Sequence, residues 1–179
     1  EQDFLPLWRR YARALKQRNA LLKAGARDGQ LDSWDHELAE AGEPLSRRRR
    51  VYLDRLQQRL PRVMDLLGPG LGAARTDYLA GWRSEELSLA DALLVARDRD
   101  RAAGHTSVGP HRADWRLGFA ARPAGEALSR GQAKLAALGC LMTQAEDCQR
   151  AVAAGYCAFM AKPTSTHEIA ATVRCVAGQ

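Results

Sequence analysis

The feature of this chain that most constrains its fold is the regular recurrence of apolar residues through its first 67 positions. The first stripe of apolar residues consists of Phe4, Trp8, Tyr11, Leu15 and Leu22. These residues recur at intervals of three or four, or sums of them, and basic residues largely occupy the other positions. The spacing predicts an amphipathic helix over residues 4–22. Glycine residues at positions 25 and 29 interrupt the pattern, so we expect the helix to end before them.

A second helical pattern begins around residues 32–34. Its later stripe consists of Tyr52, Leu56, Leu60, Val63 and Leu67, and it ends at residues 68–70, which are Gly-Pro-Gly. Pro44 lies inside the pattern, and we expect it to kink or divide the helix because proline has no backbone N–H to donate. Together the two patterns predict a helical hairpin.

The next part of the chain mixes strand and helix patterns. Residues 76–82 and 115–119 alternate enough to predict strands, and residues 88–103 predict a helix. Ser84 or Ser88 could cap this helix. The alternation of strands and helices predicts an α/β head from which the helical hairpin projects.

The charge balance permits a polyanionic partner. The net charge of +6 and the pI of about 9.5 are compatible with nucleic acid, although they describe only nonspecific attraction. Of the 27 basic residues only Lys16, Lys23, Lys134 and Lys162 are lysines. Arginine suits phosphate contacts through its fork geometry, but the codon usage of a GC-rich genome explains the same bias, and both interpretations stay open.

Composition also excludes several classes of protein. No apolar run approaches the roughly 20 residues that span a bilayer, and residues 1–3 match neither a signal peptide nor a transit peptide. We therefore expect a soluble, cytoplasmic protein with no membrane partner. The four cysteines form no CxxC pair and have no histidine at ligand spacing, so we expect free thiols and no zinc site.

Four consecutive arginines, Arg47, Arg48, Arg49 and Arg50, lie inside the second helical pattern. On a helix such consecutive residues point in different directions around the axis. One interpretation is a solvated helix surface. The other is a set of contacts to DNA phosphates, which would hold DNA without recognising its sequence because base edges are not contacted.

A polar, glycine-containing turn leads into an apolar helical pattern at residues 127–134. Ser129 can cap free backbone N–H groups, and Gly131 lets the backbone approach a partner closely. The first-turn amides and the helix dipole would favour an anion at this position. The simpler interpretation is a capped helix, and these residues alone leave both interpretations open.

No catalytic residue is predicted. His111 lies beside Arg112 in a glycine-bounded segment, but no nucleophile elbow, paired carboxylates or third orienting residue accompanies it, so we expect a turn histidine. The sequence contains no GxxxxGK[ST] loop, which is the element that cradles nucleotide phosphates. We expect no metal site.

Five short stretches, taken in order, resemble the RecF family of DNA replication and repair proteins, which is related to the ABC-type and chromosome-maintenance ATPases. They are residues 18–22 (RNALL), 78–82 (YLAGW), 100–106 (DRAAGHT), 109–112 (GPHR) and 128–132 (LSRGQ). The similarity extends over about residues 4–142. Each stretch is weak alone, but their order and spacing make the resemblance specific.

The resemblance implies a site shared between subunits. It identifies Ser129, Arg130, Gly131 and Gln132 as the ABC signature motif, which in this family closes over the γ-phosphate of ATP held by the opposite subunit's P-loop. It implies ATP with Mg as cofactors of the full-length family, and no cofactor bound to this chain alone. The implied partners are DNA and a P-loop-bearing ATPase subunit or homodimer partner. The helical arm would help a nucleotide-closed dimer clamp single-strand/double-strand junctions in DNA replication, repair and the SOS response.

From about residue 145 the sequence departs from that family, whose signature helix leads to an acidic strand. Residues 145–178 resemble the last third of a response-regulator receiver domain, with a helix, Ala-Gly, a strand, Lys-Pro and a final helix. The resemblance implies that Lys162 matches the lysine that pairs with the aspartyl phosphate and that Pro163 follows it in a cis bond. Because the phosphoacceptor aspartate and the acidic pair are absent, we expect a packing unit of helix, strand and helix.

The predicted fold class is α+β and helix-rich. We expect a helical arm over residues 1–70, a partial ABC-type head over 71–142 and a receiver-like segment over 143–179. The function that the resemblance implies is that of a RecF-like fragment that does not hydrolyse ATP alone. The alternatives are a noncatalytic, receiver-like signalling adaptor and a helical protein-interaction module.

Overall fold

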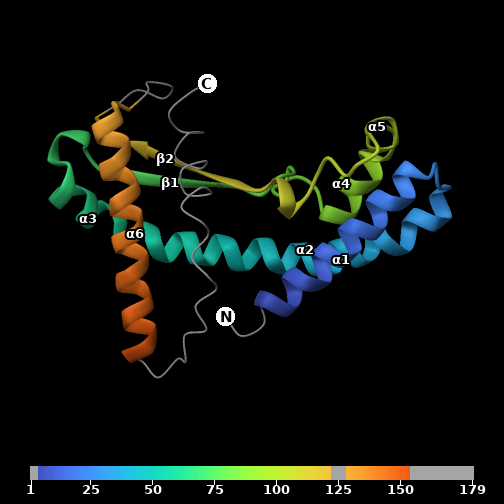
Figure 1. Cartoon of the computed structure of the whole chain (residues 1–179), viewed down its shortest axis with the longest axis horizontal. Coiled ribbons are helices and arrows are strands. Elements are labelled where there is room, and N and C mark those ends of the chain that lie inside the picture. Colours follow the sequence, from blue (N-terminus) through green and yellow to red (C-terminus); the bar gives the residue numbers. More distant parts are fainter. Residues whose placement is uncertain (1–3, 122–127, 154–179) are drawn as a thin grey trace. The chain divides into compact units, whose positions relative to one another are not determined.

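The computed structural model describes residues 4–121 and 128–153 of the chain (Figure 1). The chain divides into two compact units. Unit 1 consists of Glu1–Val51 and Leu79–Asp114, and unit 2 of Tyr52–Tyr78 and Trp115–Gln179. The segments predicted from the sequence, residues 1–70, 71–142 and 143–179, do not have the boundaries of these two units. That division into three segments stays a prediction.

Unit 1 is built mainly of helices. Its elements are α1 (Phe4–Lys23), most of α2 (Asp28–Gln57), α4 (Leu89–Val95), α5 (Arg97–Ala103) and the 3₁₀ helix η2 (Pro110–Arg112). The helix predicted at the start of the chain is confirmed as α1. α1 and α2 run antiparallel, because Trp8 lies against Arg49 whereas Arg18, later in α1, bonds to Asp35, earlier in α2.

α2 continues through Pro44, so the expectation that this proline could divide the helix is wrong. Proline removes one backbone hydrogen bond from a helix. Its neighbours Ala41 and Leu45 are fully buried in the core of unit 1. Tertiary packing on both sides of the proline therefore holds the helix together across the missing bond.

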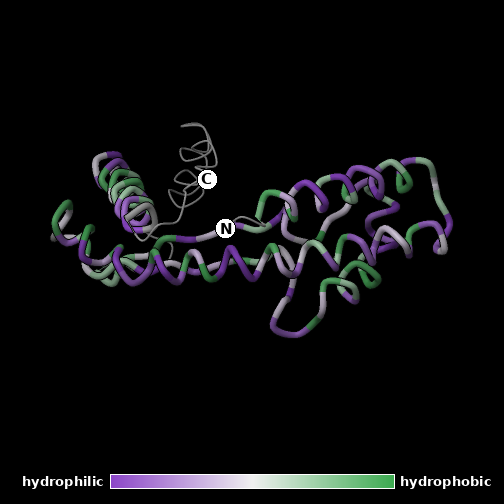
Figure 2. The backbone as a smooth tube through the Cα atoms, turned by 90° about the horizontal axis from the view of Figure 1, so that it is seen from below, coloured by the Kyte–Doolittle hydropathy of each residue, from purple (hydrophilic) through white to green (hydrophobic). Residues whose placement is uncertain are grey.

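The core of unit 1 lies between α1, α2 and α4. Its buried members are Tyr11, Ala14, Leu38, Ala39, Ala41, Leu45, Leu89 and Leu93. The helices approach closely at Gly42, where a Cβ atom would lie 2.5 Å from Leu89 Cδ2 and 3.0 Å from Tyr11 Cε2. Figure 2 shows hydrophilic and hydrophobic residues alternating along the helices, as this one-sided packing requires.

Residues 88–103 contain two short helices, α4 and α5, in place of the single predicted one. The Ser88 hydroxyl accepts a hydrogen bond from the Asp91 N–H at 3.1 Å, which confirms the predicted cap. A continuous helix over residues 88–103 is wrong, because α4 ends at Val95 and α5 begins at Arg97. Arg97 donates to Asp35 at 2.7 and 2.8 Å, so an ion pair with α2 fixes the start of α5.

A buried arginine joins three parts of unit 1. The Arg18 side chain is fully buried; its Nε donates to Asp35 Oδ1 at 2.5 Å. Its Nη1 donates to Asp100 Oδ2 at 2.6 Å and to Thr106 Oγ1 at 2.9 Å. The Thr106 N–H in turn donates to Asn19 Oδ1 at 2.8 Å. Buried charges are tolerated only when they are paired and hydrogen-bonded, so this network fixes α1 to α2 and to the loop after α5.

Two glycines bring distant backbone segments of unit 1 together. Gly81 and Gly109 have φ angles of +90° and +123°, in the region that favours glycine. The Gly109 N–H donates to the Gly81 carbonyl at 3.1 Å, and a Cβ on Gly81 would lie 2.2 Å from the Gly109 carbonyl oxygen. A side chain at position 81 would therefore force these backbones apart.

Unit 2 contains a small sheet and helices. Its elements are β1 (Ala74–Leu79), β2 (Asp114–Phe119), α3 (Leu60–Leu67), η1 (Pro69–Leu71) and α6 (Arg130–Ala153), and β1 pairs with β2. The strand predicted at 115–119 is confirmed, whereas the strand predicted at 76–82 runs from 74 to 79. The apolar stripe from Tyr52 to Leu67 belongs to two helices, because α2 ends at Gln57 and α3 begins at Leu60.

The core of unit 2 lies between α3, α6 and the sheet. Its buried members are Leu60, Met64, Leu71, Ala74, Leu117, Phe119 and Ala136. α3 and α6 approach closely because position 139 is a glycine, where a Cβ would lie 2.2 Å from Met64 Sδ. An ion pair between Arg59 and Asp147 adds a second link between these parts. The described residues thus confirm a helix-rich α+β class with a two-stranded sheet.

Replacing Arg18 with Met is expected to destabilise unit 1 by about 3–5 kcal/mol, because Asp100 would keep a buried charge without its partner. Urea unfolding followed by tryptophan fluorescence measures this loss, since Trp8, Trp34 and Trp82 all pack against the core of unit 1. Arg13→Met is the matched control, because Arg13 lies on the same helix but is exposed. A loss below about 1 kcal/mol for Arg18→Met would contradict the role of the network.

Candidate functional site

The stretch that resembles the ABC signature forms the N-terminus of α6 in unit 2. Ser129 immediately precedes the helix, which begins at Arg130. The Gln132 N–H donates to Ser129 Oγ at 3.3 Å, and the Ser129 N–H donates to Gln132 Oε1 at 3.0 Å. This reciprocal pair is a capping box, in which two backbone N–H groups at the helix start are satisfied by side chains.

The first turn of α6 is open to solvent. Ser129, Arg130 and Gly131 are all exposed, and a Cβ on Gly131 would meet no atom within 4 Å. A helix N-terminus offers further N–H groups and the positive end of the dipole, and Arg130 adds a guanidinium. This end of α6 can therefore accept an anion such as a phosphate group. The signature role of these residues stays a prediction.

The four consecutive arginines of α2 differ in their surroundings. The Arg47 side chain is 69% exposed and lies 3.8 Å from Glu43. Arg50 is also exposed and forms an ion pair with Glu85 at 2.8 Å. Arg48 is half-buried. Contact between these arginines and DNA stays a prediction.

Arg49 has a structural role within unit 1. Its Nη1 donates to the Pro110 carbonyl at 2.5 Å, and its guanidinium lies 5.5 Å from the centroid of the Trp8 ring. The second contact has the geometry of a cation–π interaction. Arg49 therefore joins α2 to α1 and η2, and a phosphate would have to compete with these contacts.

His111 is held between α1 and the preceding loop. Its Nε2 lies 3.0 Å from the Thr106 carbonyl and its Nδ1 lies 2.7 Å from the Tyr11 hydroxyl. Because a carbonyl only accepts, Nε2 carries the proton and Nδ1 accepts from Tyr11. Burial lowers the pKa of His111 and raises the pKa of Tyr11. A neutral histidine with both ring nitrogens occupied has a structural role in η2, where the sequence predicted only a turn histidine, and its neighbour Arg112 is exposed.

Four of the five stretches on which the family resemblance rests lie in unit 1, apart from Tyr78, and the fifth, residues 128–132, lies in unit 2. Contacts join residues 18–22 to residues 100–106, and Gly81 to Gly109. Sequence reasoning missed the carboxylate partners of Arg18. The signal was nevertheless present, because Arg18 lies at helical spacing from Tyr11 and Leu22 on the apolar face, where a charge requires a buried counter-charge.

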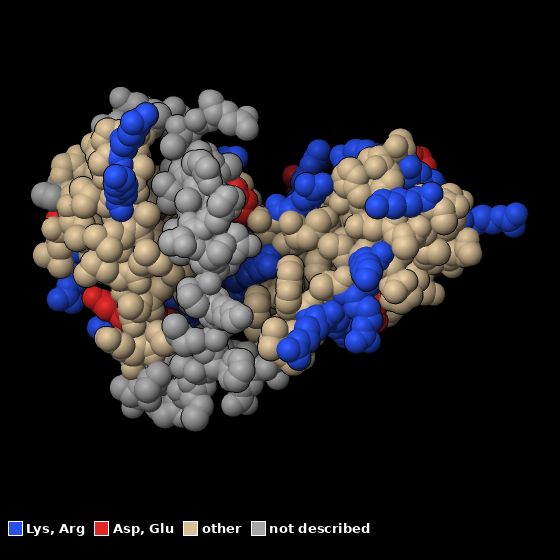
Figure 3. Space-filling model, in the orientation of Figure 1, with Lys and Arg blue, Asp and Glu red and all other residues tan. Residues whose placement is uncertain are grey.

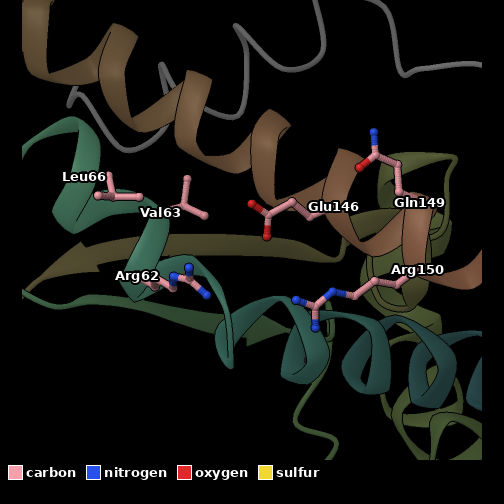
Figure 4. Close-up of a pocket in the computed structure, with 6 residues that line it drawn as sticks. All are labelled: Arg62, Val63, Leu66, Glu146, Gln149 and Arg150. Atoms are coloured by element: carbon pink, nitrogen blue, oxygen red, sulfur yellow. The ribbon is translucent and has the colours of Figure 1, made fainter.

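An open hollow in unit 2 lies between α3 and α6 (Figure 4). Its lining consists of Arg62, Val63, Leu66, Glu146, Gln149 and Arg150. The lining combines one carboxylate with two guanidinium groups and contains neither a nucleophile nor a pair of carboxylates. It offers no arrangement for acid–base or nucleophilic catalysis.

Several other kinds of site are missing from the part of the chain that the structure describes. No group of three or more His, Cys, Asp or Glu residues there could hold a metal ion. No helix among the described residues combines the length and apolar character needed to span a membrane. Neither Cys140 nor Cys148 forms a disulfide within the described residues, and burial raises the pKa of the Cys140 thiol to about 11, which makes it unreactive at neutral pH.

The predicted receiver-like residues Lys162 and Pro163 lie outside the described residues. α6 runs without interruption from Arg130 to Ala153, across the predicted junction near residue 142. Within it Thr143 is buried and its hydroxyl donates to the Gly139 carbonyl at 2.8 Å.

The described fold is similar to that of solved RecF structures. A solved structure of the recombination mediator protein RecF in the RecFOR pathway, described as RecF-ATPrS, matches with a TM-score of 0.75 and 24% identity. A second, described as RecF-ATP, matches with a TM-score of 0.73 and 23% identity. Each match covers 82% of this chain and 42% of the solved chain.

Sequence comparison identifies RecF as the protein to which this chain is similar. The DNA replication and repair protein RecF of Xanthomonas euvesicatoria pv. vesicatoria (strain 85-10) is 63% identical over 147 residues. That of Stenotrophomonas maltophilia (strain R551-3) is 65% identical over the same length. Both matches cover 82% of this chain, and the chain spans 40% of each relative. RecF of Azotobacter vinelandii is 40% identical over 152 residues.

These comparisons confirm the predicted resemblance to RecF over about four fifths of the chain. No protein-family model matches the chain. The receiver-like tail gains no support from any of the comparisons.

Replacing Ser129 with Ala should weaken the first turn of α6 by about 1 kcal/mol, because the cap of the Gln132 N–H is lost. Amide hydrogen exchange in the first turn should then accelerate roughly fivefold, as that free energy requires. Gln144→Ala is the control, since Gln144 is exposed in the interior of the same helix. Equal exchange in the first turn of both variants would show that the capping box contributes nothing.

The stability of unit 1 should fall as the pH drops below about 6.5, the ordinary pKa of histidine. Because burial lowers the pKa of folded His111, the unfolded chain binds more protons in this range and is favoured by acid. The stability of unit 1 should continue to fall until the pH is below the lowered pKa of His111 in the folded protein. Urea unfolding at a series of pH values should show a smaller slope for His111→Gln than for His36→Gln, in which an exposed histidine is removed. Identical slopes for the two variants would contradict this assignment.

Proposed function

We propose that this chain is the arm and signature part of a RecF-type DNA replication and repair protein. The observation that carries the proposal is the identity of 63–65% to two RecF proteins over 147 residues. The printed names of these relatives support action in DNA replication and repair. The names of the solved structures, RecF-ATP and RecF-ATPrS, support a nucleotide as ligand of the whole protein.

The nucleotide role belongs to the N-terminus of α6. Ser129, Arg130 and the first-turn amides would contact the γ-phosphate of ATP, with Mg, held by the P-loop of another subunit. The exposure of this turn supports the proposal, because the first turn of a helix has backbone N–H groups with no partner inside the helix. Ser129 Oγ accepts one backbone hydrogen bond and keeps its own proton to donate to a phosphate oxygen. Since the sequence has no GxxxxGK[ST] loop, the chain alone does not hydrolyse ATP.

The DNA role belongs to the helical arm. The net charge of +6 supports a polyanionic partner, and Arg47 and Arg50 are exposed on α2. In the proposed cytoplasmic assembly a nucleotide-closed dimer, of two such subunits, clamps DNA at single-strand/double-strand junctions. Such an assembly would act in gap repair and the SOS response.

The test is nucleotide-dependent association between this chain and full-length RecF of Stenotrophomonas maltophilia, the 65% identical relative. We expect tagged chain to retain that RecF in the presence of ATP but not ADP. Arg130→Glu should abolish retention, because a carboxylate would face the γ-phosphate. Lys134→Glu, one turn further along the exposed face of α6, should leave retention unchanged.

Two results would overturn the shared nucleotide site. One is equal retention of RecF by the wild-type chain and by Arg130→Glu. The other is sustained ATP turnover by the purified chain alone, because the proposal gives this chain no phosphate-binding loop of its own.

A further inference from the structure

The charge of α1 is segregated to an unusual degree. Six of its 20 residues are basic and none is acidic. Arg18 is buried and Arg10 is bound to Glu37 at 2.6 and 2.8 Å, so unit 1 uses both internally. The remaining four, Arg9, Arg13, Lys16 and Lys23, are exposed. None of these four forms an ion pair with a residue in the described parts of the chain.

These four residues lie on one face of the helix and are called here the α1 stripe. At about 100° per residue, positions 9, 13, 16 and 23 fall within an arc of roughly 80°. The buried residues of α1 are Tyr11, Ala14, Arg18 and Leu22, and their mean direction lies about 180° from that arc. With a rise of 1.5 Å per residue, the stripe is about 21 Å long.

The stripe is rigidly presented. On the opposite face of α1, Arg18 is fixed by Asp35 and Asp100, and near its start Trp8 lies under the Arg49 guanidinium. A ligand therefore meets cationic side chains on a helix that is already ordered. Figure 3 shows basic side chains gathered over the segment that Figure 1 labels α1.

Neighbouring carboxylates do not cancel this charge. Glu37 of α2 lies close enough to Arg13 for the two charges to interact. However, Glu37 accepts two hydrogen bonds from Arg10, which are the main reason why its pKa is lowered. Because Arg10 already neutralises this carboxylate, the stripe keeps its positive potential.

We propose that the α1 stripe binds the phosphate backbone of duplex DNA. The inference rests on the proposed function, which supplies DNA as the polyanion. Phosphates of one strand advance by about 3.4 Å along the duplex axis, so the stripe is long enough to face about six of them. Cations at irregular spacing on a helix surface bind this backbone without distinguishing base sequence.

The surroundings of the stripe favour a duplex over a single strand. Single-strand sites stack bases on exposed aromatic rings. The aromatic residues of α1 are Phe4, Trp8 and Tyr11; Tyr11 is buried, and the other two are half-buried against the core of unit 1. The Trp8 face is also occupied by Arg49. The stripe thus offers charge without a stacking surface.

The stripe is also a better phosphate site than the arginine run of α2. Arg47 and Arg50 lie beside Glu43 and Glu85, whereas the stripe residues have no carboxylate within ion-pair distance in the described parts of the chain. Removing the stripe should therefore reduce DNA binding more than removing Arg47 and Arg50 together.

The test measures fluorescence anisotropy of a fluorescein-labelled, 20-bp duplex of mixed sequence with the 179-residue chain at several salt concentrations. The stripe variant is Arg9→Gln/Arg13→Gln/Lys16→Gln, and the charge-matched control is Arg55→Gln/Arg62→Gln/Arg116→Gln, at exposed positions of unit 2. Three lost phosphate contacts should reduce the slope of log affinity against log salt by about 2.7. The control should change that slope by less than about 0.5, because it removes charge but no contact.

A conservative variant separates charge from folding. Arg9→Lys/Arg13→Lys keeps both charges and should bind the duplex within about threefold of wild type, because the contact is electrostatic. The urea midpoint of all variants should match that of wild type, since the changed side chains are exposed.

Three outcomes would overturn the inference, and each is distinct. Equal slope changes in the stripe and control variants would show that only net charge matters. A larger loss from Arg47→Gln/Arg50→Gln would move the site to α2. If the stripe variant lost more affinity for a 20-nucleotide single strand than for the duplex, the duplex assignment would be contradicted. No binding of either DNA by the wild-type chain would instead reject the DNA part of the proposed function itself.

Discussion

The Arg18 guanidinium carries a full positive charge where water does not reach, and unit 1 is arranged around pairing that charge with carboxylates. Asp35 comes from α2 and Asp100 from the middle of α5, so pairing this charge brings together elements that are far apart in the sequence. Isolated, the charge would cost several kcal/mol. The same constraint fixes the rotation of α1 about its axis, and this rotation turns the basic residues on its other face toward solvent.

The basic composition of the chain therefore has two physical meanings. Some arginines are structural: Arg18, Arg49, Arg59 and Arg97 each bind a described partner within their own unit. Others are exposed and without an ion pair in the described residues, as on the α1 stripe. Net charge alone cannot separate the two groups, because each arginine counts as one positive charge whether it is buried and paired or faces solvent. The separation requires knowing which face of each helix is buried.

Local features of the fold were predictable from the sequence, and long-range ones were not. The helical spacing of the apolar residues predicted α1. The spacing of Ser129 and Gln132 is sufficient for a capping box, because both partners lie within one turn. The prediction that Pro44 could divide the helix was wrong, because the packing of Ala41 and Leu45 outweighs one missing backbone hydrogen bond. The break before Arg97 depends on carboxylates more than 60 residues earlier, which periodicity does not report. The resemblance supplied the order of the motifs, whereas the contacts of residues 18–22 with residues 100–106, and of Gly81 with Gly109, required the structure.

Lysine labelling tests the central claim, that the solvent-facing side of α1 contacts DNA, most directly. The chain has four lysines, of which Lys16 and Lys23 lie on the α1 stripe and Lys134 lies on α6. Acetylation with and without a 20-bp duplex, quantified by mass spectrometry, compares them within one molecule. The account predicts that duplex DNA protects Lys16 and Lys23 and leaves Lys134 unchanged. Protection of Lys134 with unchanged labelling of Lys16 and Lys23 would contradict it.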